Sequence, residues 1–418
     1  MAEHDTSCAE TPRSLHDAAW LKRPETRAVF AALSGDGIET RAVGGAVRDA
    51  LLGLAVPEID FATTAPPETV MALAREAGLK AIPTGIAHGT VTVVADGVSF
   101  EVTTLRRDVE TFGRHATVAF TQDWAEDARR RDFTLNALYA DADGVLYDPL
   151  GGYEDVMAGR VCFIGDAEAR IKEDYLRILR FFRFNATYGK GALDAAGLSA
   201  CVKQRAGLAQ LSAERVAAEL KRLLMAPRAF AAIEALFDYG LLSDILGSAP
   251  RLDRLARLIA IETARARAPS AVLRLAALAM FVAEDAPRLA ARFKLSNAEQ
   301  AVLALGADET FEGALPEEAA AKRLLYRLGP DDYASHVLLT WAGRGASVDD
   351  SKWRRALSLP ERWQVPVFPL RGPDIMALGD LKGPEIGEML RRLEQLWIDS
   401  GFAEDRDRLL ERAKTLAR

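Results

Sequence analysis

The stretch GGAVRDALLGLAVPEIDFATT, residues 44–64, decides which fold this chain can adopt. It joins a glycine pair to a short helical segment and then to an extended run with acids at alternate positions, Glu58 and Asp60. Residues i and i+2 of an extended strand face the same side, so the two carboxylates are expected to project together. Such a pair suits one or two Mg²⁺ ions, which prefer carboxylate oxygens.

The glycine pair before the acids is typical of a phosphate site. Gly44 and Gly45 allow the backbone to approach a ligand closely, and the helix that they open presents free N–H groups to an anion. Arg48, one turn later, adds a charge-assisted contact. Taken alone, a Gly-Gly turn or a solvated acid-x-acid strand edge is a common structural feature. Their occurrence together, in this order, is what indicates a site for phosphates and metal.

The rest of the first 155 residues predicts mixed α and β structure. Two β-rich runs flank Asp96-Gly97, a dipeptide that favours a β-hairpin. Alternation places Glu101 on the polar face of that hairpin. The following segment, residues 106–120, is polar and is expected to form an irregular loop.

The bulk composition limits the classes of protein that this chain can belong to. With 418 residues it is too long for one ordinary core, and two to four domains are expected. After about residue 155 Ala, Leu, Arg and Glu dominate with helical periodicity, which predicts an all-helical second part. No run reaches the ~18 apolar residues of a membrane span. The net charge of −7 argues against indiscriminate binding of polyanions but leaves a local basic face open.

Cysteine and histidine usage points away from metal-finger and disulfide-rich classes. The three cysteines, Cys8, Cys162 and Cys201, are far apart, and only five histidines are present. Neither a zinc site nor a disulfide framework is expected, and nothing at the start of the sequence signals export. The expected compartment is therefore the cytoplasm.

A second candidate constellation is EDARRRDFTLNALY, residues 126–139. Three arginines precede Asp132, and Asn136 follows one helical turn later, so both side chains are expected to meet one ligand. The alternative is a solvated charge run at the start of a helix.

Two further motifs lie on predicted helices. In IKEDYLRILRFFRFNA, residues 171–186, Asp174, Arg177 and Arg180 are spaced three apart, and their donors and acceptors suit the edge of a nucleobase. An amphipathic helix with i, i+3 ion pairs explains the same spacing. In ERVAAEL, which begins at residue 214, Arg215 and Glu219 are expected to form a structural i, i+4 pair.

Five motifs in this order resemble the class II tRNA nucleotidyltransferase and poly(A) polymerase family, part of the DNA polymerase β-like superfamily. They are GGAVRD, EID, RRDFTLNA, EDYLRILRFFRF and ERVAAEL. The resemblance implies an α+β fold: an N-terminal polymerase β-like nucleotidyltransferase head with a mixed sheet, followed by an all-α neck, body and tail. The boundaries that it implies are a lead-in at 1–27, the head at 28–155, a neck with the base-selecting motif at 156–230, and an RNA-binding body and tail at 231–418.

The resemblance also implies roles for individual residues. Glu58 and Asp60 correspond to the catalytic, metal-binding acids, and Glu101 is a third metal-side carboxylate unless it belongs to an ordinary polar strand face. The residues that correspond to the nucleotide site are Gly44, Gly45, Arg48, Arg131, Asp132, Asn136, Asp174, Arg177 and Arg180. The family usually has aspartate at both positions of the acid pair. Glu58 departs from this pattern, and we expect activity to persist at some cost in rate.

The implied activity is Mg²⁺-dependent addition of CCA, from CTP and ATP, to the 3′ ends of tRNA. The terminal 3′-hydroxyl attacks the α-phosphate and pyrophosphate leaves. Poly(A) polymerases share every motif, so addition of A alone, partial addition (CC only or A only) and a non-catalytic RNA-binding homologue remain alternatives. The expected partners are tRNA, CTP and ATP, with no membrane.

The second half of the sequence carries no motif, but it contains a series of arginines that contact either an RNA backbone or solvent. They are Arg251, Arg254, Arg257, Arg265 and Arg267.

Overall fold

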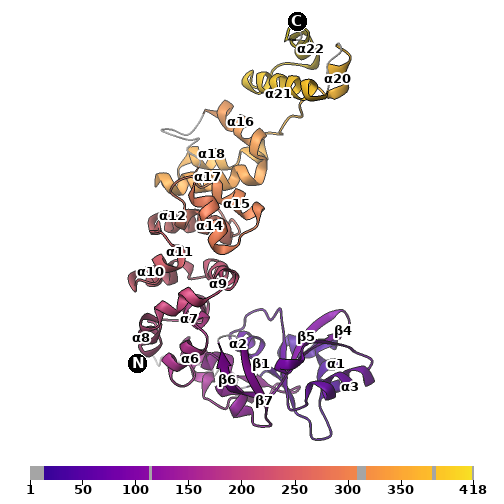
Figure 1. Ribbon diagram of the computed structural model, residues 1–418, viewed down its shortest axis with the longest axis vertical. Coiled ribbons are helices and arrows are strands. Elements are labelled where there is room, and N and C mark those ends of the chain that lie inside the picture. Colours follow the sequence, from indigo (N-terminus) through magenta and orange to yellow (C-terminus); the bar gives the residue numbers. More distant parts are fainter. Residues whose placement is uncertain (1–13, 113–114, 308–316, 379–382, 417–418) are drawn as a thin grey trace, which may run out of the picture. The chain divides into compact units, whose positions relative to one another are not determined.

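The computed structural model of the chain describes residues 14–112, 115–307, 317–378 and 383–416. They divide into two compact units, the first ending at Gly247 and the second beginning at Ser248. The first unit combines a β-sheet with helices, and the described part of the second unit contains helices and no strand (Figure 1). The expected fold class, an α+β start followed by helices, is confirmed.

The first unit is built on a seven-stranded mixed sheet with the order β3-β4-β5-β2-β1-β8-β9. Its strands are β1 (Thr40–Val43), β2 (Asp60–Thr63), β3 (Lys80–Gly85), β4 (Thr90–Ala95), β5 (Val98–Thr104), β8 (Tyr139–Ala140) and β9 (Leu146–Tyr147). Strands β2 and β5 pair in parallel and all other neighbours are antiparallel.

The predicted hairpin joins β4 to β5. Asp96 and Gly97 both have positive φ angles, 48° and 79°, as a tight two-residue hairpin turn requires. Phe100 and Val102 of β5 are buried, whereas Glu101 between them is exposed. The alternation read from the sequence is therefore present in the strand.

The two faces of the sheet have different neighbours. Helices α1 (Pro24–Leu33) and α3 (Pro67–Glu76) cover one face, where the rings of Phe30 and Phe61 lie 4.9 Å apart. Ala62, the next residue of β2, belongs to a separate buried cluster that includes side chains from α4 (Trp124–Arg129) and β8. Because Asp60 alternates with Phe61 along the strand, its side chain projects away from α1 and α3.

Part of the expected lead-in, residues 1–27, is already packed against the first unit. A short 3₁₀ helix, η1 (Ala19–Lys22), buries Trp20 and Leu21, and α1 already begins at Pro24. The sequence predicted the helix that begins near Pro24, but it did not predict η1, because four residues are too few to show a periodicity.

Residues 106–112 and 115–120 form two paired strands, where the sequence had predicted an irregular loop. Strands β6 (Arg106–Phe112) and β7 (His115–Phe120) pair antiparallel, with a register irregularity between Asp108 and Glu110. The loop was predicted from the polar residues of this segment. Its Val, Thr and Phe residues favour strands, and the structure follows them.

The remaining helices of the first unit follow the sheet in the chain, apart from α2, which lies between β1 and β2. They are α2 (Gly45–Leu51), α5 (Gly152–Ala158), α6 (Ala167–Glu173), α7 (Leu176–Tyr188), α8 (Ala195–Lys203), α9 (Ala213–Met225), α10 (Ala229–Asp238) and α11 (Leu242–Leu246). Helix α7 packs against α9 and α10 and buries a row of aromatic side chains, among them Phe181 and Phe182.

The second unit consists of packed helices over the residues that the structure describes. They are α12 (Leu252–Ala264), α13 (Ala271–Ala279), α14 (Asp285–Phe293), α15 (Asn297–Ala304), α16 (Glu318–Leu328), α17 (Pro330–Arg344), α18 (Ser351–Leu357), α19 (Leu359–Arg362), α20 (Gly372–Met376), α21 (Gly383–Asp399) and α22 (Arg406–Leu416). No helix among the described residues is both long and apolar enough to cross a membrane.

A buried arginine connects four of these helices. Arg254 of α12 donates hydrogen bonds to the carbonyl oxygens of Met280 (3.2 Å), Gly306 (2.9 Å) and Leu339 (3.3 Å), which belong to or directly follow α13, α15 and α17. Burial, together with the positive charge of the neighbouring Arg251, lowers its pKa to about 10. Arg254 therefore has a structural role and is not available to RNA.

Candidate active site

Two of the three predicted metal-side acids lie side by side on the central strands β2 and β5, and the third lies just before β2. Glu58 lies just before β2, Asp60 is the first residue of β2, and the intervening Ile59 is buried while both acids are exposed. In the parallel pairing of β2 with β5, Asp60 stands directly beside Glu101. The sheet register thus brings together two carboxylates that are 41 positions apart in the sequence.

The electrostatic environment of Asp60 is that of a crowded carboxylate. Partial burial and the negative charges of Glu101 and Glu58 raise its pKa to about 6, although the Arg131 guanidinium acts in the opposite direction. Like charges held this close disfavour ionisation of one another, and a bound cation would relieve the repulsion.

The acids do not by themselves surround a metal ion on all sides. Among the described residues, no group of three or more His, Cys, Asp or Glu side chains is placed closely enough to enclose a metal ion. Mg²⁺ is commonly held by one or two carboxylates together with waters and substrate phosphates. The exposed carboxylates of Asp60 and Glu101 permit that arrangement. The donor set therefore fits a hard divalent cation.

The glycine turn lies against the second motif. Gly44 has φ +69° and ψ −116°, and its N–H donates to the Leu138 carbonyl at 3.0 Å. A Cβ on Gly44 would lie 3.4 Å from the Asn136 carbonyl oxygen and 3.6 Å from an Arg131 guanidinium nitrogen. Those distances are ordinary van der Waals contacts, so it is the combination of positive φ and negative ψ that requires glycine at this position.

Arg131 is held in place from two sides. Its guanidinium donates to the Asp127 carboxylate at 3.1 Å and to the Tyr139 hydroxyl at 3.3 Å. Burial would raise the pKa of Asp127, but Arg131 and Arg130 outweigh that effect and hold it at about 2. Asp127 is thus a permanent anion that fixes Arg131 beside the glycine turn. Sequence reasoning missed Asp127, although its i, i+3 and i, i+4 spacing to the two arginines is the signal of such a contact.

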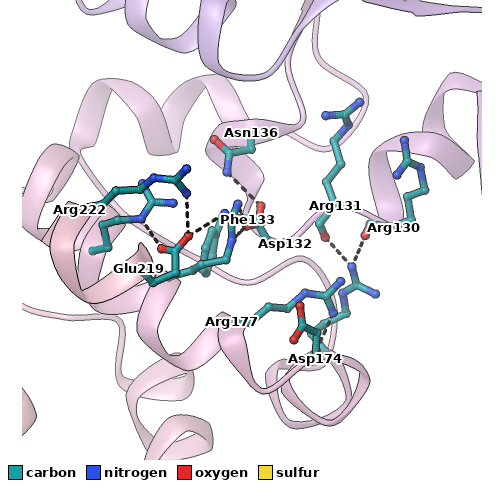
Figure 2. Close-up of polar contacts among 12 residues, drawn as sticks. Arg130, Arg131, Asp132, Phe133, Asn136, Asp174, Arg177, Glu219 and Arg222 are labelled. Atoms are coloured by element: carbon teal, nitrogen blue, oxygen red, sulfur yellow. Dashed lines mark hydrogen bonds and ion pairs between the residues drawn. The ribbon is translucent and has the colours of Figure 1, made fainter. Parts of the chain in front are cut away.

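Asp132 connects the segment after α4 to helix α7. One of its carboxylate oxygens accepts from the Asn136 side chain and from the Phe133 N–H, each at 2.9 Å, and the other accepts from Arg180 at 2.8 Å (Figure 2 labels Asp132, Phe133 and Asn136). Burial would raise the pKa of Asp132, but Arg180 and the hydrogen bonds lower it below its ordinary value. Asp132 and Asn136 do meet, though through a single 3₁₀ turn, η3 (Thr134–Asn136), instead of the expected helix.

The Arg48 guanidinium forms hydrogen bonds to other side chains of the protein. Its guanidinium donates to Asp49 at 2.9 Å, to Asn136, and to the Tyr188 hydroxyl at 2.6 Å, and it stacks 3.9 Å from the centre of the Tyr188 ring. The side chain is 7% exposed. Arg48 therefore links α2 to Asn136 and to the end of α7.

The expected base-reading residues do not share one helix. Helix α6 ends at Glu173, Asp174 follows as its C-cap, and α7 begins at Leu176, whose N–H donates to the Asp174 carboxylate at 3.1 Å. The second Asp174 oxygen accepts from Arg215 of α9 at 2.7 Å. A pocket of about 380 Å³ is lined by Asp174, Arg215 and their neighbours.

Arg177 and Arg180 lie outside that lining. The Arg177 guanidinium donates to the Glu173 carboxylate and to the Arg170 carbonyl, and both of these residues belong to α6. Arg180 pairs with Asp132 instead of accompanying Asp174. The structure therefore places Asp174 in the pocket lining and leaves the two arginines outside it, although the Arg177 backbone N–H donates to the Asp174 carbonyl at 3.0 Å.

Glu219 is the centre of an arginine cluster rather than the partner of Arg215. Its buried carboxylate accepts from Arg183 at 2.5 Å and from Arg222 at 3.2 Å, and Arg180 lies 3.8 Å away (Figure 2). The predicted i, i+4 pair is wrong because Arg215 turns toward Asp174. Long-range contacts of this kind leave no local pattern in the sequence.

Comparison with known proteins gives the family. The sequence model described as Poly A polymerase head domain matches residues 40–162, and the one described as Probable RNA and SrmB-binding site of polymerase A matches residues 192–255. The chain is 37% identical to CCA tRNA nucleotidyltransferase 1, mitochondrial, of Danio rerio over 391 residues, covering 89% of this chain and 86% of that protein. It is 33% identical to the CCA-adding enzyme of Geobacillus thermodenitrificans, covering 92% and 95%.

A solved structure extends this likeness to three dimensions. The CCA-adding enzyme of Bacillus stearothermophilus in complex with CTP is 29% identical, with a TM-score of 0.72 over 94% of this chain and 99% of that chain. Sequence likeness over nearly the whole length agrees with the fold and with the order of the motifs. The chain belongs to the tRNA nucleotidyltransferase and poly(A) polymerase family of nucleotidyltransferase enzymes.

Proposed function

We propose that this chain adds C, C and A, from CTP and ATP, to the 3′ ends of tRNA without a nucleic-acid template. The observation that carries the proposal is the position of Asp60 beside Glu101 on the central strands β2 and β5, with the Arg131 guanidinium acting on Asp60 and lying next to the Gly44 turn. The names of the relatives, which are CCA-adding enzymes, and the CTP in the Bacillus stearothermophilus complex support the same substrates.

In the proposed reaction, the 3′-hydroxyl oxygen of tRNA forms a bond to the α-phosphorus of the nucleotide. The bond from that phosphorus to the oxygen bridging to the β-phosphate breaks, pyrophosphate leaves with the electron pair, and the hydroxyl proton passes to water. Mg²⁺, our proposed cofactor, supplies charge neutralisation and a lowered pKa of the attacking hydroxyl when bound. No side chain forms a covalent bond to the nucleotide.

Glu58, Asp60 and Glu101 would hold the ion through their carboxylates. Asp60 must be ionised for this role, and its raised pKa makes ion binding compete with protons near pH 6. The backbone of Gly44 and Gly45 would face the triphosphate, since two residues without side chains let a ligand approach the backbone closely.

Arg131 would contribute positive charge to the triphosphate, because Asp127 and Tyr139 fix its guanidinium beside the Gly44 turn. Asp132 and Asn136 would contact the ribose. Arg48 and Arg180, which donate to Asn136 and Asp132 respectively, would position these two side chains rather than touch the nucleotide.

Asp174 would accept from the base at the pocket beside Arg215. Arg177 would take part only after its guanidinium turns from Glu173 toward the base.

Incorporation assays test the proposal directly. tRNA lacking its terminal CCA is supplied with Mg²⁺ and with CTP, ATP or both, and the products are resolved at single-nucleotide length. We expect two additions with CTP alone and three with both nucleotides. Absence of incorporation would exclude the enzyme and leave an RNA-binding homologue. A long ladder with ATP alone would identify a poly(A) polymerase, and addition of only CC or only A would identify a partial activity.

We also propose that residues 28–155 act as the catalytic head, 156–230 as a neck that selects the base, and 231–418 as an RNA-binding body and tail. The separate core of the second unit supports a division of labour, although that unit begins later, at Ser248. The cytoplasm is our proposed compartment. Free Cys162 and Cys201 fit a reducing environment of this kind.

A further inference from the structure

A chain of hydrogen bonds leaves helix α7 at one residue and returns to it at another. Arg180 donates to Asp132 at 2.8 Å, and Asp132 accepts from Asn136 at 2.9 Å (Figure 2 labels Asp132 and Asn136). Asn136 in turn accepts from Arg48, which donates to the hydroxyl of Tyr188 at 2.6 Å. Arg180 and Tyr188 both belong to α7 and lie about 12 Å apart along its axis. The chain therefore joins the proposed nucleotide site to α7 at two points.

These partners leave one orientation for the Asn136 side-chain amide. Its oxygen accepts from Arg48, which can only donate, and its nitrogen donates to the ionised Asp132, which can only accept. Exchanging the oxygen and the nitrogen would break both hydrogen bonds. The second N–H of the amide has no partner among the described residues. Asn136 thus offers a ligand one donor of fixed direction.

Arg48 keeps its position because Tyr188 contacts it in two ways. The Tyr188 hydroxyl accepts from the guanidinium, whose central carbon also lies 3.9 Å from the centre of the Tyr188 ring. The Arg48 side chain is only 7% exposed, so water cannot readily replace a lost acceptor. Asp49 accepts from the same guanidinium at 2.9 Å. We expect a guanidinium that loses the hydroxyl to turn toward Asp49 and away from Asn136.

Tyr188 is itself held in place. Its ring lies 5.7 Å from that of Phe184, a buried residue one turn earlier on α7. Burial raises the pKa of the Tyr188 hydroxyl, although the positive charge of Arg48 acts in the opposite direction, and Asp49 adds to the rise as a charge and as a hydrogen-bond partner. The hydroxyl therefore keeps its proton at neutral pH and remains an acceptor for Arg48.

The free N–H of Asn136 suits a hydroxyl oxygen of a sugar. A site built to hydrogen-bond a hydroxyl rejects the analogue that lacks it, because the polar group of the site is then left without a partner. Asn136 is 8% exposed, so this penalty applies to it. An amide held in this way can distinguish a ribonucleotide from a 2′-deoxyribonucleotide.

We propose that Tyr188 is a positioning residue for sugar selection. Its hydroxyl holds Arg48 against Asn136, so that the Asn136 amide favours ribonucleotides over 2′-deoxyribonucleotides. The inference rests on the proposed function, in which Asn136 contacts the ribose. Tyr188 lies outside all five sequence motifs and between the two segments that the family models match.

The test compares Tyr188→Phe with the wild-type full-length protein. This substitution removes one oxygen and keeps the ring that stacks on Arg48. The matched control is Tyr147→Phe in β9. The Tyr147 ring also stacks on an arginine, 4.3 Å from the Arg41 guanidinium, but its hydroxyl makes no hydrogen bond among the described residues. Thermal melting verifies that both variants are folded.

Calorimetric titration with CTP and with dCTP, in Mg²⁺ and without tRNA, gives the preference for the ribonucleotide. We expect Tyr188→Phe to weaken CTP binding about tenfold, the order expected for one hydrogen bond to a charged group, and to leave dCTP binding nearly unchanged. In incorporation assays the KM for CTP should rise more than kcat falls. A preference equal to that of the control would overturn the proposal, even if both nucleotides bind more weakly, because Tyr188 would then serve the fold alone. A wild-type protein without a preference for CTP would overturn it too.

A double-substitution cycle tests whether Tyr188 acts through Asn136. Asn136→Ala should lose the preference for CTP by itself, and adding Tyr188→Phe should change it no further. If the second substitution narrows the preference again, Tyr188 acts by another route and the proposal is wrong.

The two proposals fail in different ways. If the wild-type protein binds CTP but incorporates no nucleotide, the proposed function is lost, and the binding preferences still decide the role of Tyr188. If incorporation proceeds and Tyr188→Phe keeps the full preference, the function stands and the role of Tyr188 is wrong. If the wild-type protein binds neither nucleotide, both proposals fail.

Discussion

At the scale of single residues, the Asp60 carboxylate serves the proposed chemistry and destabilises the fold. Its pKa, about 6 against an ordinary 3.8, means that the folded protein holds this proton more tightly than the unfolded chain. Stability is therefore lost as pH rises from about 4 to 6, and the loss persists at higher pH. Below pH 3.8 the carboxyl is protonated in both states and contributes nothing.

Asp60→Asn should abolish incorporation yet stabilise the metal-free protein at pH 7.5. After allowance for solvent screening we expect a gain of about 1 kcal/mol, or about 2–4 °C in the Tm of this unit. Thermal melting in EDTA at pH 7.5 and pH 4 measures it. An equal gain at pH 4 would show that the carboxylate charge is not its cause.

Glu58 occupies a position at which the resemblance found in the sequence leads us to expect aspartate. Its carboxylate lies just outside β2 and is one methylene longer than aspartate. We expect Glu58→Asp to remain active and to reach its half-maximal rate at a lower Mg²⁺ concentration, whereas Glu58→Gln should lose most activity. A Mg²⁺ titration of CTP incorporation distinguishes them. Full activity of Glu58→Gln would remove Glu58 from the ion site.

At the scale of elements, the ion pair between Asp132 and Arg180 joins the sheet-bearing part of the first unit to α7. Arg180→Met would leave a buried carboxylate without its cation, which typically costs about 3–5 kcal/mol. Urea denaturation at pH 7 measures the loss. Adding Asp132→Asn should recover part of it, since the uncompensated charge is then gone. Arg222→Met, which removes an exposed arginine from α9, is the control and should cost far less.

The contact between α9 and the start of α7 sets the direction of Asp174. Arg215→Ala should lower kcat/KM for CTP and ATP by about 10–100-fold, the effect of losing one hydrogen bond between charged groups. Discrimination against UTP and GTP should narrow at the same time. Single-nucleotide incorporation assays with all four nucleotides, compared with Arg222→Ala on the same helix, test this. Unchanged selectivity would show that Arg215 does not position Asp174 for reading the base.

The sequence predicted those features that depend on neighbouring residues. The turn at Asp96-Gly97 and the exposed side of Glu101 follow from local φ preference and strand alternation. The pairing of Arg180 with Asp132 and of Glu219 with Arg183 could not be predicted from the sequence. These partners lie 48 and 36 positions apart and meet only because of the way α7 packs. Asp174 fell outside the expected helix because its side chain caps the next one.

At the scale of the whole molecule, the two units have separate cores and should respond separately to ligand. Calorimetry should show that CTP with Mg²⁺ stabilises one transition by about 2.7 kcal/mol at 100 times the Kd and leaves the other unchanged. The transition that shifts should be the one that Asp60→Asn also shifts. Equal shifts in both would indicate that the units unfold as one.

Arg254 has a consequence for the timing of synthesis. Its three carbonyl acceptors lie 26, 52 and 85 positions further along the chain. At about 5–20 residues per second, a ribosome makes the last of them roughly 4–17 s after the arginine itself. The first unit, which ends at Gly247, has by then been synthesised in full. Its proposed catalytic head can therefore fold before the carbonyl groups that surround Arg254 in the second unit have all been made.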